Sequence, residues 1–196
     1  MEQTQTKLNL PGWLTTIFQV YLAAVLPVLL VLINARLLMS GAFLRWEYNR
    51  PWLPDDPFGF TREDRLEYAP PALAYLFNNE DIDFLGGMEL PNGDPLYNER
   101  ELSHMVDVKG VTKGLARYGY SAIGLWVVFG VLLYFSNRQK LRTGLLSGSL
   151  LTVGLIVTGL IAVATSFRWL FTQFHALFFE GDTWSVSYTH LRAHET

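Results

Sequence analysis

The sequence contains no cysteine among its 196 residues. This absence excludes disulfide bonds, catalysis by a thiolate, cysteine-ligated metals and acylation of the protein on a cysteine. Charged residues are also scarce, at 17%, and the formal net charge is −3. Lys and Arg form no basic cluster, so the sequence predicts no nucleic-acid partner.

Apolar residues are abundant and are concentrated in long runs. Half of the residues are hydrophobic and the mean hydropathy is +0.19, which is high for a soluble domain of this length. Of the 18 Asp and Glu residues, 14 lie between Trp46 and Tyr118. The runs Trp13–Ile33, Gly119–Phe135 and Leu145–Thr165 carry no charge and have the length of membrane spans. We therefore predict an all-α integral membrane protein, a small helical bundle with one hydrophilic head.

This pattern divides the chain into five segments, with a head of helices and loops between the first two spans. They are 1–45 (N-terminal segment and first span), 46–117 (head), 118–165 (second and third spans with a short basic loop), 166–184 (aromatic interfacial segment) and 185–196 (tail). The tail resembles a translated sequencing adapter, and we expect it to be non-native.

Several local signals concern the spans. Pro27 predicts a kink and a backbone carbonyl without a helical partner. Residues 34–44 are expected to continue the first helix as a half-apolar tail. Gly144 and Gly148 form a GxxxG pair, which predicts the close approach of a neighbouring helix. Residues 136–144 are expected to form the basic loop.

In the head, Thr61 followed by Asp64 has the pattern of a capping box and predicts the start of a short helix. Pro70 and Pro71 are expected to interrupt or restart that helix. Asn92-Gly93 lies in a loop-forming stretch and is typical of a hairpin turn.

The end of the head carries the first pattern that indicates chemistry. Asn98 followed by Glu101 is a second capping-box pattern, so we expect a helix to begin here and to continue into the second span. On that helix Glu101 and His104 share a face, and Asp107 lies one turn after His104. This places a titratable imidazole between carboxylates. Taken alone, His104 is more often a surface histidine than a catalyst.

A second histidine follows the third span. Residues 167–184 include seven aromatic residues besides His175, a composition typical of the membrane interface. Taken alone, His175 is more often an interfacial filler. Two spans separate this segment from the head, so His104 and His175 are expected on the same side of the membrane.

Other polar and aromatic residues are candidates for supporting roles. Lys109, Lys113 and Arg117 are spaced by four and form a stripe that either faces lipid phosphates or is a solvated helix face. Arg168 is expected either to hold a carbonyl of lipid or substrate or to anchor the third span. Trp184 is expected to anchor the chain near the site.

Two motifs together resemble the lipoprotein intramolecular transacylase family of small bacterial membrane proteins. The more specific parts are Asn98–Lys109 and Phe171–Phe179, the latter followed by Asp182 and Trp184; Thr61–Leu76 is a weaker match in the right order. The family continues into a fourth apolar helix, and we expect that helix to be missing here by truncation.

The resemblance implies an activity and a location. The activity moves the sn-2 acyl chain of a diacylglyceryl lipoprotein onto the α-amine of its N-terminal cysteine and gives a lyso-form lipoprotein. The location is the bacterial cytoplasmic membrane, with the head on the extracytoplasmic side. The expected partners are the diacylated lipoprotein and membrane lipid, and the sequence carries no signal for an oligomeric state.

The same resemblance implies that His104 and His175 are the catalytic pair. The substrate brings its own amine nucleophile, so no cofactor and no metal is expected. We expect His104 to be the general base, because Glu101 or Asp107 can orient it and stabilise its cation. His175 would then stabilise the oxyanion or return the proton.

Two other classes of function remain open at this stage. One is a metal-dependent membrane hydrolase that uses His104, His175 and either Asp107 or Glu101 as ligands. The sequence has no HExxH motif or closely spaced His pair in its favour. The other is a non-catalytic membrane assembly factor whose head binds a partner.

Overall fold

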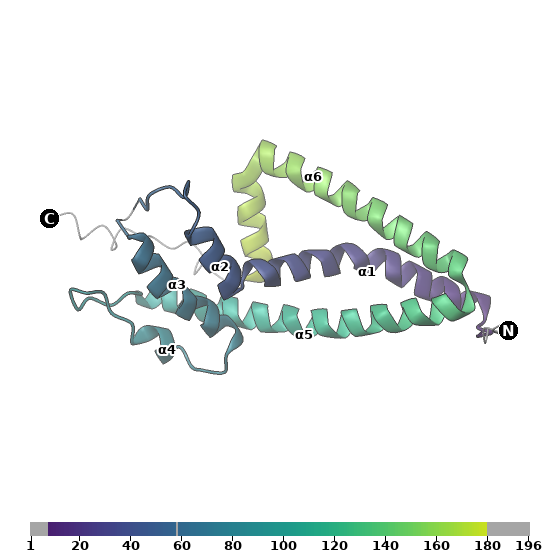
Figure 1. Cartoon of the computed structure of the whole chain (residues 1–196), viewed down its shortest axis with the longest axis horizontal. Coiled ribbons are helices and arrows are strands. Elements are labelled where there is room, and N and C mark those ends of the chain that lie inside the picture. The colour runs from purple at the N-terminus through teal and green to yellow at the C-terminus, as the bar shows by residue number, and fades with distance from the viewer. Residues whose placement is uncertain (1–7, 58, 180–196) are drawn as a thin grey trace. The chain divides into compact units, whose positions relative to one another are not determined.

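The computed structural model describes residues 8–57 and 59–179. Within these ranges the chain forms six α-helices and no β-strand (Figure 1). They are α1 (Gly12–Leu38), α2 (Gly41–Tyr48), α3 (Arg62–Phe77), α4 (Asp83–Gly86), α5 (Glu99–Ser136) and α6 (Arg138–Phe178). The helices α1, α5 and α6 are long and apolar enough to cross a membrane, which confirms the predicted class of all-α membrane protein.

The chain divides into two compact units, with boundaries that fall inside the long helices. Among the described residues, the spanning unit consists of 8–34 and 116–170, and the head unit consists of 35–57, 59–115 and 171–179. A helix of 38 residues rises about 57 Å, well beyond the roughly 30 Å of a hydrocarbon core. The charged first half of α5 therefore lies outside the membrane and belongs to the head.

In the spanning unit, α1 packs against α5 through aromatic rings and polar groups. The rings of Phe18 and Phe129 stack with centroids 4.2 Å apart. The indole of Trp126 donates to the carbonyl of Leu22 at 3.1 Å. Leu22 and Leu133 are fully buried in this contact.

The same unit joins α1 to α6 through the two predicted glycines. A Cβ atom on Gly144 would lie 3.1 Å from the carbonyl oxygen of Gln19, and one on Gly148 would lie 3.0 Å from that of Ala23. The GxxxG prediction is therefore confirmed. Helix α1 continues through Pro27, whose missing N–H would otherwise bond to Ala23. Gly148 thus packs against the carbonyl that the proline leaves without its helical donor.

The connection between α5 and α6 is shorter than the basic loop expected over 136–144. Only Asn137 separates the two helices, and its side-chain oxygen accepts from the backbone N–H of Lys140 at 3.0 Å. This contact caps α6 and allows the helix to begin at once. The ammonium of Lys140 donates to Gly12, Thr15 and Thr16 at 2.8, 2.9 and 2.6 Å, and so ties the starts of α6 and α1 together.

Two other local predictions are wrong. The first helix continues only through Leu38 of the expected 34–44, because Ser40 accepts from the backbone N–H of Phe43 and caps a separate helix, α2. Helix α3 is not interrupted at Pro70 and Pro71. The fixed φ of proline is compatible with a helix, and the cost of the lost hydrogen bonds is offset by packing at the end of α3.

The head unit has its own side-chain core. Tyr75 and Leu76 at the end of α3 and Leu85 in α4 are buried together. The predicted capping box of Thr61 and Asp64 is present at the start of α3. The turn at Asn92-Gly93 is also present, with Gly93 at a φ of +86° and one antiparallel bridge from Glu89 to Pro95. Helices α2 and α3 pack together in this unit.

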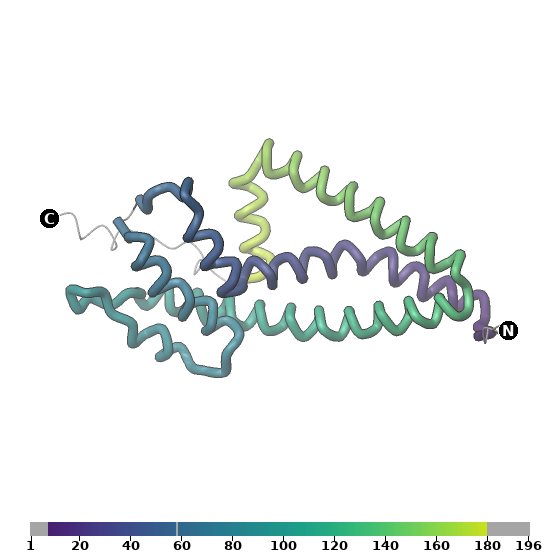
Figure 2. Tube along the Cα trace, viewed as in Figure 1, coloured from purple at the N-terminus to yellow at the C-terminus, as the bar shows by residue number. Residues whose placement is uncertain are grey.

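Helix α6 changes direction at Ser166, whose φ of −156° and ψ of 50° are not helical (Figure 2). The aromatic segment that we expected at the membrane interface is therefore a separate helical stretch that ends at Phe178. Its residues from Phe171 onward belong to the head unit.

Candidate active site

The site begins with the cap of α5. The backbone N–H of Asn98 donates to the Glu101 carboxylate at 2.9 Å, and the backbone N–H of Glu101 donates to the Asn98 side chain at 2.9 Å. This is the reciprocal pattern of a capping box, as the sequence predicts. Glu101 is only 8% exposed, so its carboxylate has a structural task at the helix start.

His104 follows on α5 and is half-buried. Its Nδ1 atom is enclosed and has no hydrogen-bond partner among the residues that the structure describes. Burial lowers the pKa of His104; the Asp107 carboxylate opposes this shift, and a charge on His175 adds to it. Lowering of the pKa favours the neutral imidazole near pH 7.

His175 lies in the last part of α6, in contact with phenylalanine rings. Its Nδ1 is 2.8 Å from the carbonyl oxygen of Phe171. A carbonyl can only accept, so Nδ1 donates a proton in this contact. The rings of Phe171 and Phe174 lie 3.9 and 5.4 Å from the imidazole, measured between centroids.

Phe179 connects the two histidines. Its ring centroid is 5.3 Å from that of His104 and 5.6 Å from that of His175. Residues 71 positions apart are thus gathered in one cluster of the head unit. Phe179 ends the Phe171–Phe179 motif, but an aromatic run in the sequence does not show which ring faces a partner.

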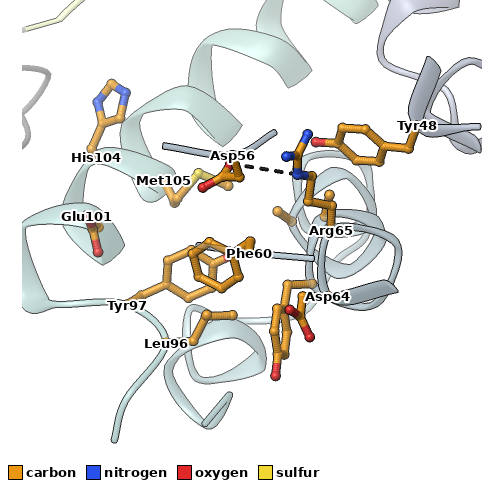
Figure 3. A pocket seen from close by; sticks show the side chains of 13 residues that line it. Tyr48, Asp56, Phe60, Asp64, Arg65, Leu96, Tyr97, Glu101, His104 and Met105 are labelled. Atoms are coloured by element: carbon orange, nitrogen blue, oxygen red, sulfur yellow. Dashed lines mark ion pairs between the residues drawn. The ribbon is translucent and has the colours of Figure 1, made fainter. Parts of the chain in front are cut away.

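A cavity of about 420 Å³ opens beside this cluster (Figure 3). Most of its wall is aromatic or aliphatic, with the ion pair of Asp56 and Arg65 on one side and His104 at its margin. A mostly apolar cavity of this size with few polar groups is typical of a small-molecule or acyl-chain site. It is lined by Tyr48, Asp56, Phe60, Asp64, Arg65, Tyr68, Ala69, Ala72, Leu96, Tyr97, Glu101, His104 and Met105.

Lys109 lies in neither of the two settings expected for it. Its ammonium donates to the side chain of Asn78 at 3.0 Å and to the carbonyl of Glu80 at 2.5 Å, and it lies 3.7 Å from the centre of the Tyr75 ring. Burial is the largest cause of its lowered pKa, followed by the charge of Lys113. Lys109 therefore joins α5 to the end of α3 and fixes the helix that carries His104.

The other predicted supporting residues are more dispersed. Asp107 is close enough to His104 that its carboxylate partly opposes the lowering of the His104 pKa by burial. Arg168 is exposed on α6, two residues after Ser166, and belongs to the spanning unit. Trp184 lies outside the described residues.

The described residues do not favour a metal centre. Within 8–57 and 59–179, no group of three His, Asp or Glu side chains is placed to hold a metal ion. The ligand set of His104, His175 and either Asp107 or Glu101, considered for a metal-dependent hydrolase, is therefore not assembled in this part of the chain.

Comparison with known proteins gives two matches. A family model described as lipoprotein intramolecular transacylase Lit matches residues 18–190, a range that extends into the segment 185–196. An uncharacterized protein of Aquifex aeolicus (strain VF5) is 27% identical over 168 residues, which are 86% of this chain and 75% of the relative. No solved structure matches the chain.

Proposed function

Because the chain belongs to the lipoprotein intramolecular transacylase family, we propose that it converts diacylated lipoproteins to the lyso form. In this reaction the sn-2 acyl chain of the diacylglyceryl-cysteine moves to the α-amine of the same cysteine. The observation that carries the proposal is the cluster of His104, Phe179 and His175, which unites the two family motifs.

The reaction needs proton transfer and positioning rather than an enzyme nucleophile. The substrate amine attacks the sn-2 ester carbonyl and loses a proton, which gives a cyclic tetrahedral oxyanion. The C–O bond to glycerol then breaks, the glycerol oxygen gains a proton, and an amide remains. Holding the amine and the ester in contact supplies several kcal/mol of the barrier in favourable cases.

His104 is suited to accept the amine proton. Its lowered pKa keeps the imidazole neutral, so a lone pair is present at neutral pH. Asp107 stabilises the imidazolium that forms, since its charge favours the protonated state. The role that we expected of Glu101 is less direct, because its carboxylate caps the helix.

His175 is suited to donate the proton that the oxyanion and the departing glycerol oxygen need. The Phe171 carbonyl orients the ring through Nδ1, and in the proposed step His175 donates a proton to the oxyanion and then to the departing glycerol oxygen. The proton taken by His104 returns to His175 through solvent, which restores both residues. The apolar cavity beside His104 would receive apolar parts of the substrate.

We propose that the head unit, with both histidines, lies on the extracytoplasmic side of the cytoplasmic membrane. An even number of spans separates the head from the His175 segment, which supports a common side for the two residues. The family resemblance supports the extracytoplasmic side.

The test is to express the full-length chain in a bacterium that makes only diacylated lipoproteins. Mass spectrometry of the N-terminal lipopeptide should show one acyl chain moved to the amine at unchanged total mass. His104→Asn and His175→Asn should each lower conversion by about 10²- to 10⁴-fold, the range for loss of a general acid or base. Gln173→Asn, at an exposed position of the same helical stretch, is the matched control and should retain conversion.

An unchanged lipopeptide, with the folded protein present in the membrane, would refute the proposal. Full activity of both histidine variants would instead point to the non-catalytic assembly factor. Loss of activity on treatment with a chelator would revive the metal-dependent hydrolase.

A further inference from the structure

Two tryptophans in the head unit are strongly exposed. Trp46 on α2 is 59% exposed, and Trp52 in the following loop is 69% exposed. Large apolar side chains that gather on a surface and are bordered by polar residues are typical of an interaction site.

Arg50 lies between these tryptophans. Its guanidinium carbon is 5.1 Å from the centre of the Trp46 ring and 4.8 Å from that of Trp52. The same guanidinium pairs with Glu47 at 2.5 Å, and both side chains are 30% exposed. Trp46, Arg50 and Trp52 thus form one surface, here called the Trp–Arg surface, in which a cation is held between two indole rings.

The length of chain between the first span and α2 limits how far this surface can lie from the membrane. The uncharged run of α1 ends at Ile33, and α2 starts three residues after the end of α1. From Ile33, five residues of helix, three of extended chain and five more of helix carry the backbone of Trp46 at most about 25 Å away. The Trp–Arg surface is therefore within reach of the head-group layer where the first span leaves the bilayer.

The loop that carries Trp52 also borders a second cavity, of about 450 Å³. Arg50, Arg62 and Arg65 line it together with Asp55 and Asp56, and two of these arginines are in ion pairs, Arg50 with Glu47 and Arg65 with Asp56. A phosphate-bearing head group can exchange with the Glu47 carboxylate on Arg50, because guanidinium groups pair well with phosphate oxygens.

We propose that the Trp–Arg surface docks the head onto the membrane, with Trp46 and Trp52 inserted at head-group depth and Arg50 bound to the phosphate of an anionic phospholipid. Indole rings prefer this depth, and basic groups near it are attracted to anionic lipid. A lipid surface supplies the apolar contact and the anion at the same place. The proposal goes beyond the transacylase reaction and does not depend on it.

The absence of cysteine allows a direct test with single spin labels. Pro51→Cys places a label next to the Trp–Arg surface, and Pro91→Cys is the matched control, since both prolines are exposed in head loops. The full chain is placed in nanodiscs of phosphatidylglycerol and phosphatidylcholine. Collision rates with oxygen and with a water-soluble nickel chelate are then measured by electron paramagnetic resonance.

We expect the oxygen-to-nickel collision ratio to be several-fold higher at position 51 than at position 91. Arg50→Gln should lower the ratio at 51 in anionic nanodiscs towards its value in phosphatidylcholine alone. Trp46→Ala with Trp52→Ala should bring it close to the control. Circular dichroism and membrane insertion of each variant show whether the fold is retained.

Equal collision ratios at 51 and 91 in the unsubstituted background would overturn the proposal. So would a label at 51 that becomes protected only when a lipoprotein is added, because the surface would then bind a protein. An equal ratio in anionic and neutral nanodiscs would remove the assigned role of Arg50.

Discussion

In the spanning unit α6 packs on α1 through glycines set against backbone, whereas the head unit is held by a core of large side chains and by polar caps. Gly144 and Gly148 lie against Gln19 and Ala23, while Leu85 is fully buried in the head. Lipid is as apolar as leucine and gives no hydrophobic driving force between helices, so close approach and dispersion contribute more there, including at the buried contact of Leu22 and Leu133. Water drives apolar burial in the head.

This difference also explains which kinds of residue are exposed on each unit. In the most apolar stretch of α6 no residue is buried, which suits a helix surrounded by lipid. The polar groups of the head instead cap helices or bind one another across loops, as Lys109 does with Asn78. The two units should therefore respond differently to the same kind of substitution.

The largest effect is expected for Leu85→Ala in the head core. Leu85 is 0% exposed, and such a truncation costs about 2–5 kcal/mol when the surroundings do not collapse. Hydrogen exchange measured by mass spectrometry should show the amides at the end of α3 exchanging faster, with the spanning unit unaffected. Val106→Ala, at a 47% exposed position of the head, is the control. Equal effects of the two changes would show that the head has no such core.

A smaller effect is expected for Gly148→Ala, which tests the packing of the spans. The new Cβ would meet the Ala23 carbonyl at 3.0 Å, and overpacking of this kind costs about 1–3 kcal/mol. The thermal unfolding midpoint in detergent should fall. Gly154→Ala makes the same change on the same helix where nothing lies within 4 Å, and should have little effect. If both variants unfold alike, close approach does not stabilise the spans.

The smallest effect is expected at the cap of α3. Thr61→Ala removes the side-chain cap, a change that costs about 1 kcal/mol.

The hydrogen bonds from Thr61 lower the pKa of Asp64. Asp64 therefore adds stability above the ordinary pKa of about 3.9, and this part is lost as the pH falls through the depressed value.

This pH dependence has its own test. Stability of the head followed by circular dichroism should fall between the ordinary and the depressed pKa of Asp64, and Asp64→Asn should flatten that part of the curve. A curve that keeps its slope in the variant would assign the dependence to other carboxylates.

The sequence predicts best what depends on neighbouring residues or on lipid. The three spans, both capping boxes and the turn at Asn92-Gly93 follow from local patterns, and the structure has them. The GxxxG motif predicts a close contact but does not identify its partner, because Ala23 lies on a helix more than a hundred residues earlier.

The errors and omissions have a common physical reason. Pro70 and Pro71 should break a helix by local rules, yet the burial of Tyr75 and Leu76 keeps α3 intact. The contacts of Lys109 with Asn78 and Glu80 span 31 and 29 residues, and the position of Phe179 beside His104 spans more. Tertiary packing decides these features, and one-dimensional patterns do not contain it.

The hydrogen bonds between α6 and α1 form only after both helices have been synthesised. The ammonium of Lys140 bonds to Thr15, 125 residues earlier, so at about 5–20 residues per second some 6 to 25 s separate their synthesis. During that interval α1 lacks the packing contact between Gly148 and the carbonyl of Ala23. Until α6 has been synthesised and inserted, α1 must therefore be stabilised by other contacts, with lipid, water or the insertion machinery.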